Sequence, residues 1–288
     1  MTRSDSPSSI LNPQFSIPPN GRPRPIGIFD SGVGGLTVFR EISRALPRQP
    51  LVYLGDSARV PYGTKSPSTV IRYSLEAAHH LLTYDISMLV VACNTATAAA
   101  LPKLKETLAI PVIGVVEPGA RAAVDRTSGV VGVIATEGTV KSKAYTNAIK
   151  ALDPDVEVIE SAAPLFVPLA EEGWANTHVA REVAEIYLEP LIDHGIDTLV
   201  LGCTHYPLLR GALEKFLGDT VRLVDSAENC ARAVSQMLEH EKLRAASGSA
   251  GELAVALTDP PDVFLEVARR ALRLEIGEVG LRPVLQPK

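Results

Sequence analysis

Apolar and polar residues alternate along this chain in a pattern that predicts strands and helices in regular succession. Short apolar runs bounded by Gly, Pro or polar residues are typical of parallel strands that are covered on both faces. Such runs predict strands over residues 25–29, 51–55, 86–92, 110–115, 130–135, 156–161, 197–202, 221–224 and 253–257. Segments with helical spacing predict helices over residues 38–45, 68–83, 95–108, 177–194, 204–217, 227–245 and 261–273, with a further helix after Gly138. This alternation predicts an α/β fold whose sheets are mainly parallel and doubly wound.

One arrangement of strand and cysteine occurs twice. Around Cys93 and around Cys203 the chain runs from an Asp through an apolar strand to a small residue, the Cys and two polar side chains. Cys93 lies 66 residues after Gly27, and Cys203 lies 71 residues after Gly132, in two strand-and-glycine segments that are also alike. Two halves with one layout therefore predict two pseudo-symmetric lobes that each contribute one cysteine.

The predicted lobes follow from where this layout restarts. Residues 26–117 together with 225–288 form the first α/β lobe, and residues 118–224 form the second. The segment Glu117-Pro118-Gly119 is the expected crossover between them. Residues 1–25, rich in Ser, Pro and Asn, are expected to be a disordered leader. Because open α/β sheets bind ligands at the carboxyl ends of their strands, we expect the active site in the cleft between the lobes.

Composition excludes several classes of protein. A net charge of −5 over 288 residues leaves no basic footprint for nucleic acid. Three cysteines are too few for a disulfide framework and fit a reducing compartment. No apolar run approaches the ~20 residues that a membrane span needs, and the N-terminus lacks the apolar core of a signal peptide. We therefore expect a cytoplasmic protein that binds neither nucleic acid nor membrane.

Two thiols on opposite walls of a cleft suit proton transfer at a carbon atom. One thiolate removes the proton, and the opposite thiol returns one to the other face. Thiols start with a pKa of about 8.5, and a position before a helix is expected to lower it. Asp30 and His205 can hold or pass protons beside the cysteines. Neutral donors and acceptors that could clamp an amino acid are Ser31, Asn94, Thr95 and Thr204.

Other readings of these residues are weaker. The turn Gly32-Val33-Gly34-Gly35 has neither the G-x-G-x-x-G spacing nor the Lys of a P-loop, so it indicates close backbone approach rather than nucleotide binding. A redox pair would require a C-x-x-C motif, and Cys203 with His205 supplies too few zinc ligands. Cys230 stands on a predicted helix away from any motif and is expected to be a core residue.

Four motifs in order along the chain resemble those of the glutamate racemases, within the aspartate/glutamate racemase family. They are Asp30-Ser31-Gly32-Val33-Gly34-Gly35-Leu36-Thr37, Pro61-Tyr62-Gly63, Ala92-Cys93-Asn94-Thr95-Ala96 and Gly202-Cys203-Thr204-His205-Tyr206-Pro207. The resemblance extends over about residues 26 to 270, and the segment after residue 246 is the least family-like. It implies two α/β lobes around paired cysteines and the interconversion of L- and D-glutamate, which supplies D-glutamate for bacterial peptidoglycan.

The resemblance also implies roles for individual positions. Cys93 and Cys203 match the acid/base cysteines, with Cys93 acting on D-glutamate and Cys203 on L-glutamate, and Asp30 and His205 beside them. The implied substrate-binding residues are Asp30, Ser31, Tyr62, Gly63, Asn94, Thr95, Thr136, Thr204 and His205. Asp56 and Glu171 are implied as supporting residues. The resemblance implies no cofactor and no metal, and it is compatible with a homodimer.

Two alternatives stay open at this point. One is a related enzyme that acts on aspartate or a hydantoin as a racemase, or on maleate as an isomerase. The other is a non-catalytic amino-acid-binding protein on the same fold. Intact Cys93, Cys203, Asp30 and His205 argue against loss of the catalytic site.

Overall fold

A computed structural model of the chain describes residues 23–243, 251–272, 276 and 279–281. The strands are β1 (Ile26–Asp30), β2 (Leu51–Gly55), β3 (Met88–Val91), β4 (Val112–Gly114), β5 (Val130–Ala135), β6 (Glu157–Ala162), β7 (Thr198–Gly202), β8 (Arg222–Asp225), β9 (Leu253–Leu257) and β10 (Val279–Leu281). The α-helices are α1 (Leu36–Ala45), α2 (Pro67–Leu82), α3 (Asn94–Thr107), α4 (Val116–Val124), α5 (Glu137–Ser142), α6 (Ala144–Leu152), α7 (Phe166–Glu171), α8 (His178–Asp193), α9 (Arg210–Leu217), α10 (Ser226–His240) and α11 (Asp262–Leu272). Two short 3₁₀ segments are η1 (Ser57–Arg59) and η2 (Tyr206–Leu209).

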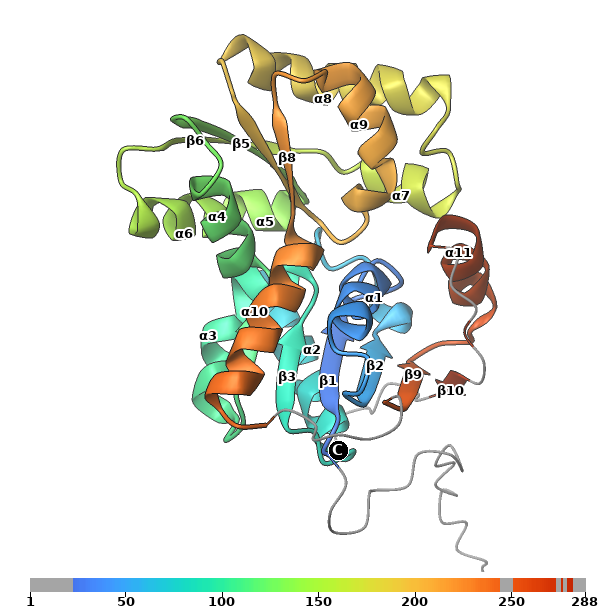
Figure 1. The fold of residues 1–288 in the computed structure, drawn as a ribbon. Coiled ribbons are helices and arrows are strands. Elements are labelled where there is room, and N and C mark those ends of the chain that lie inside the picture. The colour runs from blue at the N-terminus through green and yellow to red at the C-terminus, as the bar shows by residue number, and fades with distance from the viewer. Residues whose placement is uncertain (1–22, 244–250, 273–275, 277–278, 282–288) are drawn as a thin grey trace, which may run out of the picture.

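The first sheet contains six strands in the order β10-β9-β2-β1-β3-β4, and its strand pairs are parallel. Alternate residues of its strands enter two different cores. Ile26 and Ile28 of β1 pack into the core shared with α1, α10 and α11, whereas Phe29 packs into the core shared with α2 and α3. Helices therefore cover both faces of this sheet, as Figure 1 shows, which explains why its strands are apolar throughout.

The second sheet contains four parallel strands in the order β6-β5-β7-β8. One face packs against α4 and α6 through residues such as Val133 and Val200, and the other packs against α7, α8 and α9 through Leu199 and Leu201. Both halves of the molecule are thus doubly wound α/β units, as the pattern of strands and helices predicts. Figure 1 shows the two sheets stacked one above the other, with β8 leading down into α10.

The internal repeat appears directly in the strand order. The sequence β2-β1-β3-β4 in the first sheet corresponds to β6-β5-β7-β8 in the second. In both sheets the first strand of the half is central, and the strand before the cysteine lies next to it. Strands β9 and β10 extend the first sheet beyond β2, and among the residues that the structure describes they have no counterpart in the second sheet.

The connection between the two halves is a helix. The segment Glu117-Pro118-Gly119, expected to be a crossover, lies inside α4, with Pro118 in the first turn, where a missing N–H costs nothing. Of the expected leader 1–25, residues 1–22 lie outside the described residues. Arg24 is described, and its guanidinium binds the carbonyls of Asp85 and Ile86.

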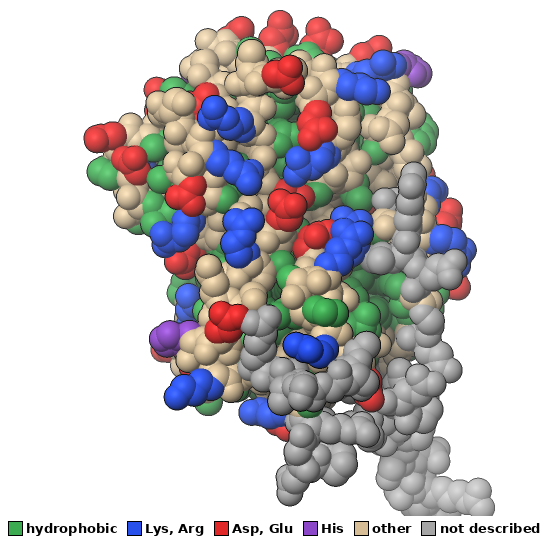
Figure 2. Space-filling model, in the orientation of Figure 1, with side chains coloured by type: hydrophobic (Ala, Val, Ile, Leu, Met, Phe, Trp, Pro, Cys, Tyr) green, Lys and Arg blue, Asp and Glu red, His purple; other side chains and the backbone are tan. Residues whose placement is uncertain are grey.

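Charged side chains of both signs are interspersed over the face drawn in Figure 2. This surface agrees with the modest net charge of −5. Within the part of the chain that the structure describes, no helix is both long and apolar enough to cross a membrane.

Candidate active site

Cys93 directly follows β3 and is the N-cap residue of α3. Its Sγ accepts a hydrogen bond from the backbone N–H of Ala96 at 3.5 Å and lies 3.6 Å from Oγ of Ser31. Burial nevertheless raises the pKa of the Cys93 thiol to about 12, with a further contribution from the charge of Asp30. The expectation that the helix start lowers this pKa is therefore wrong. The Ala96 N–H does act in the expected direction, but desolvation is the larger effect.

Cys203 directly follows β7, in the position that corresponds to Cys93, but its surroundings differ. It is followed by the 3₁₀ segment η2, and the α-helix α9 begins only at Arg210. The helix predicted over residues 204–217 is thus only partly α-helical, because its first part is η2 and α9 covers its second part. The neighbour of Cys203 Sγ is Nδ1 of His205, at 3.8 Å.

His205 lies between a thiol and a carboxylate. Its Nε2 is 2.8 Å from Oε1 of Glu171, the last residue of α7, while its Nδ1 faces Cys203. Burial lowers the pKa of His205, but hydrogen bonds with Cys203 and Glu171 and their negative charges outweigh burial and raise it to about 10. The imidazole is therefore cationic at neutral pH and can stabilise a thiolate at Cys203.

Asp30 ends β1 and is fully buried at the junction of the lobes. Its carboxylate accepts a hydrogen bond from the N–H of Gly32 at 2.9 Å and one from Oγ1 of Thr204 at 3.4 Å. Burial raises the pKa of Asp30, and the charge of His205 opposes this. We call the residues around Cys93 the first wall of the site and the residues around Cys203 and His205 the second wall. Asp30 lies within electrostatic reach of Cys93 on the first wall and of His205 on the second.

The glycine-rich turn lets these walls approach each other. A Cβ on Gly34 would overlap Oγ1 of Thr204 and lie 2.5 Å from Nδ1 of His205. A Cβ on Gly35 would overlap the side chain of Asp30. Both glycines therefore let side chains approach the turn closely.

Hydrogen bonds join the first half of the chain to the second around the cysteines. Oγ1 of Thr95 lies 2.9 Å from Oγ1 of Thr136, and Oδ1 of Asn94 accepts from the hydroxyl of Tyr145 at 2.8 Å. The carbonyl of Gly63 accepts from the N–H of Gly138 at 2.9 Å. The Nδ2 of Asn94 is buried and has no protein partner, so it is free to bind a ligand.

Asp56 secures the loop that presents Tyr62 and Gly63. Its buried carboxylate accepts hydrogen bonds from Nε of Arg59 at 2.7 Å, from Oγ1 of Thr258 at 2.8 Å and from the hydroxyl of Tyr62. Asp56 therefore joins the residues that follow it, Arg59 and Tyr62, to Thr258. Thr258 directly follows β9, in the segment that is least family-like.

The sequence reasoning named the residues at the strand ends but missed several of their partners. Tyr145 is one, because no helix bounds were predicted between residues 139 and 156, although Tyr145 and Ile149 show helical spacing and are both buried. Thr37 is another: its Oγ1 donates to the carbonyl of Thr204 at 3.1 Å across the two halves. Cys230, expected to be a core residue, is fully buried in α10, which confirms that prediction.

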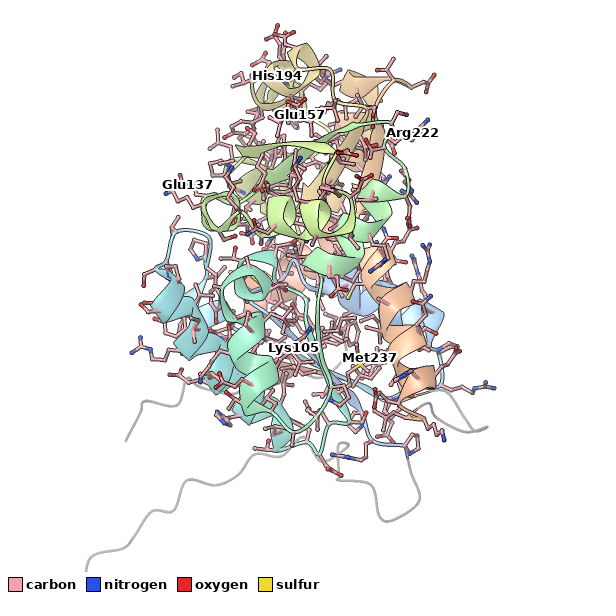
Figure 3. The ribbon with its side chains drawn as sticks, turned by 90° about the vertical axis from the view of Figure 1, so that its left-hand side faces the viewer. Lys105, Glu137, Glu157, His194, Arg222 and Met237 are labelled. Carbon is pink, nitrogen blue, oxygen red and sulfur yellow. The ribbon has the colours of Figure 1, made fainter. Side chains whose placement is uncertain are left out.

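A surface groove elsewhere on the molecule is distinct from this site. It has a volume of about 520 Å³ and lies between α4 and α10, with Lys105 and Met237 among its lining residues. Figure 3 shows these two residues on neighbouring helices of the lower half. None of the predicted site residues lines this groove.

The residues around Cys93 and Cys203 can support acid/base chemistry. Both thiols are 6% exposed, and the charge of Cys203 contributes to the raised pKa of Cys93, so the two sulfurs lie within electrostatic reach. Around them are a buried carboxylate, a cationic imidazole and an unpartnered amide N–H₂. Such a set can bind a small zwitterion and move a proton to or from it.

The chain is similar to known glutamate racemases in sequence and in structure. A glutamate racemase from Geobacter metallireducens is 56% identical over 256 residues, which cover 88% of this chain and 94% of that protein. The crystal structure of a glutamate racemase isoform from Bacillus anthracis superposes with a TM-score of 0.87 at 41% identity, covering 90% of this chain and 97% of that one. A Francisella tularensis glutamate racemase in complex with D-glutamate gives a TM-score of 0.85 at 35% identity, covering 91% and 98%. The sequence model of the Asp/Glu/Hydantoin racemase family matches residues 26–234. The chain therefore belongs to the Asp/Glu/Hydantoin racemase family.

Proposed function

We propose that this chain interconverts L- and D-glutamate by two-base proton transfer, with Cys93 and Cys203 as the two bases. The observation that carries the proposal is the placement of one buried thiol after the corresponding strand of each sheet, β3 and β7. The choice of glutamate rests on relatives such as the Geobacter metallireducens glutamate racemase and the Francisella tularensis structure solved with D-glutamate. The D-glutamate formed would supply peptidoglycan synthesis in the cytoplasm.

In the direction from L- to D-glutamate, the Cys203 thiolate removes the α-proton and becomes a thiol. Cationic His205, 3.8 Å from this sulfur, stabilises the thiolate before the transfer. The Cys93 thiol then gives its proton to the opposite face of Cα and becomes a thiolate. Proton exchange through Asp30 and His205 restores the starting protonation states, so the reaction only relocates protons.

The high pKa of Cys93 suits its role as the proton donor in this direction. In the reverse direction Cys93 must be a thiolate, and the N–H of Ala96 and the hydroxyl of Ser31 are the groups that lower its pKa. The α-ammonium of a bound amino acid adds a positive charge to the same enclosed space, which favours the thiolate further. Backbone N–H groups at the start of α3 are available to the α-carboxylate.

The substrate would be held by polar groups from both halves of the chain. Nδ2 of Asn94 has no protein partner and would donate to a carboxylate. Ser31, Thr95, Thr136 and Thr204 add hydroxyl groups around it. Because Thr95 and Thr136 already bond to each other across the halves, bound glutamate would replace or extend contacts that hold the cleft closed.

Incubation of each enantiomer in deuterium oxide tests this proposal. Each should gain solvent deuterium at Cα as it converts, and the product should carry deuterium from its first appearance. Chiral chromatography with mass spectrometry measures both quantities. A panel of glutamate, aspartate, a hydantoin and maleate decides the substrate. Preference for any of the other three, or glutamate binding without exchange of the α-proton, would contradict the proposal.

A further inference from the structure

A helix from the C-terminal segment reaches the second half of the chain next to the site. The guanidinium of Arg270, on α11, donates a hydrogen bond to the backbone carbonyl of Glu171, at the end of α7. Figure 1 shows α11 beside α7, away from the strands β9 and β10 that flank it in sequence. The two residues are 99 positions apart, so folding of the two halves brings them together.

The backbone of α7 leaves room for this arginine. Gly173, just beyond the helix, has a φ of +73°, and a Cβ there would lie 2.9 Å from both Cδ and Nε of Arg270. Glycine is the residue that adopts this backbone conformation readily and leaves this space open. The arginine side chain thus packs against Gly173 while its terminal N–H₂ binds the carbonyl of Glu171.

The other end of this contact is firmly held. Phe264, Val267 and Ala268 of α11 are buried in the core of the first half, between 0% and 5% exposed. Within α11, Oε1 of Glu266 lies 3.2 Å from the Arg270 guanidinium and orients it. Arg270 therefore links a helix anchored in the first core to the last residue of α7.

That residue is also the partner of His205. The side chain of Glu171 is partly exposed, so its carboxylate depends on its backbone for its position. The charged and titratable groups facing His205 are Glu171 from α7, Cys203 from its own turn and Asp30 from β1. Movement of the α7 end would change the first of these and leave the other two in place.

We propose that Arg270 is a positioning residue, which holds the Glu171 backbone so that the Glu171 carboxylate stays on Nε2 of His205. The chain of contacts runs from the first core through α11, Arg270 and Glu171 to His205 and Cys203. The inference rests on the proposed function, because it assigns a second-base role to Cys203. It also gives the segment after residue 246, which contains Arg270, a role in positioning the catalytic groups.

Arg270→Ala tests the proposal, with Arg269→Ala as the matched control on the same helix. Arg270→Ala should lower kcat for glutamate racemisation by about fivefold to tenfold with little change in KM, because geometry around the reacting group changes rather than substrate contacts. Arg269→Ala should keep the wild-type values. Arg270→Lys, which keeps one cationic donor, should fall between the two.

A double-variant comparison separates positioning from general stability. If Arg270 acts through the Glu171 carboxylate, Arg270→Ala should have no further effect on kcat in a Glu171→Ala background. An equal loss of kcat in both backgrounds would overturn the proposal, as would a wild-type kcat in Arg270→Ala. If the alanine variant does not fold, the same comparison is made with Arg270→Lys and Arg270→Gln.

The pKa of His205 gives a readout that requires no turnover. Histidine-labelled protein is titrated by NMR, and the His205 signal is assigned by its absence in His205→Asn. The pKa of His205 should fall in Arg270→Ala and stay unchanged in Arg269→Ala. An unchanged pKa in Arg270→Ala overturns the link even if the wild-type protein proves not to racemise glutamate, whereas absent racemisation with a lowered pKa overturns only the proposed function.

Discussion

The two walls of the site have the same topology but treat their cysteines differently. Each thiol follows the strand next to the central strand of its half, and each is 6% exposed. On the first wall Cys93 is the N-cap residue of α3, and its sulfur forms hydrogen bonds with two neutral groups, the Ala96 N–H and the Ser31 hydroxyl. On the second wall Cys203 has a charged partner, His205, which is itself paired with Glu171.

This difference shows that a repeated backbone need not repeat its electrostatics. The strand order determines where a thiol lies, because parallel strands end at one edge of the sheet. The pKa of that thiol depends on burial and on the side chains that neighbouring elements bring to it. On the first wall burial keeps the pKa of the Cys93 thiol high, whereas the second wall places a cationic imidazole beside its sulfur.

The largest effect we expect is loss of either thiol. Cys93→Ala and Cys203→Ala should each lower kcat for racemisation in both directions by roughly 10³-fold, because each direction uses both sulfurs. Polarimetry or chiral chromatography measures the rates. Cys230→Ala is the control, since that thiol is also buried but lies on α10 in the core of the first half. Wild-type rates in the Cys93→Ala/Cys203→Ala double variant would contradict the two-base mechanism.

A smaller effect is expected where the two walls touch. Gly34→Ala places a Cβ against Thr204 and His205 and should push the second wall away from Asp30. Because a misplacement of about 1 Å can cost on the order of 100-fold, kcat/KM should fall by roughly tenfold to 100-fold. Gly211→Ala on α9 is the matched control, as its Cβ would meet only Asn176 at 3.7 Å. An unchanged kcat/KM in Gly34→Ala would show that activity does not depend on the close approach of the two walls.

Titration of His205 and of Cys93 should lower the free energy of unfolding in two different pH ranges. Both groups have a folded pKa above the unfolded value, so each favours folding below its unfolded pKa and loses that contribution as pH rises. For His205 the range is from 6.5 to about 10, and for Cys93 it is from 9.0 to about 12. Urea unfolding of wild type and His205→Gln from pH 6 to 10.5 measures the first range.

The wild-type advantage over His205→Gln in free energy of unfolding should be largest near pH 6 and shrink steadily towards pH 10. The free energy of unfolding of Cys93→Ala should change with pH as that of the wild type does below pH 9, and the two should differ in pH dependence only above pH 9. A constant difference between wild type and His205→Gln across the whole range would contradict the assignment of a raised pKa to His205.

The smallest effect should come from the contact between Thr258 and Asp56, which supports the loop of Tyr62. Thr258→Val removes a hydrogen bond from the buried carboxylate of Asp56, which should cost about 1–3 kcal/mol of stability. Because Arg59 and Tyr62 still hold Asp56, KM should rise only about twofold to threefold. Thr107→Val, on the exposed end of α3, is the control and should change the free energy of unfolding by less than about 0.5 kcal/mol. A large loss of kcat with little change in the free energy of unfolding would contradict this supporting role and indicate that Thr258 acts on the reaction itself.

The sequence by itself determined the fold class, the repeat and the residues at the strand ends. Buried parallel strands leave apolar runs that are readable one segment at a time, and their carboxyl ends gather at one edge of a sheet. Asp30, Cys93 and Cys203 could therefore be named together although they lie far apart in the chain.

Only the tertiary structure decided how those residues are supported and charged. The contacts of Tyr145 with Asn94, and of Arg270 with Glu171, depend on how two independently wound halves meet. The raised pKa of Cys93 depends on burial, which competes with the helix start that the sequence does display. Local patterns record which element a residue joins, whereas contacts between halves and the loss of water arise only when both halves have folded against each other.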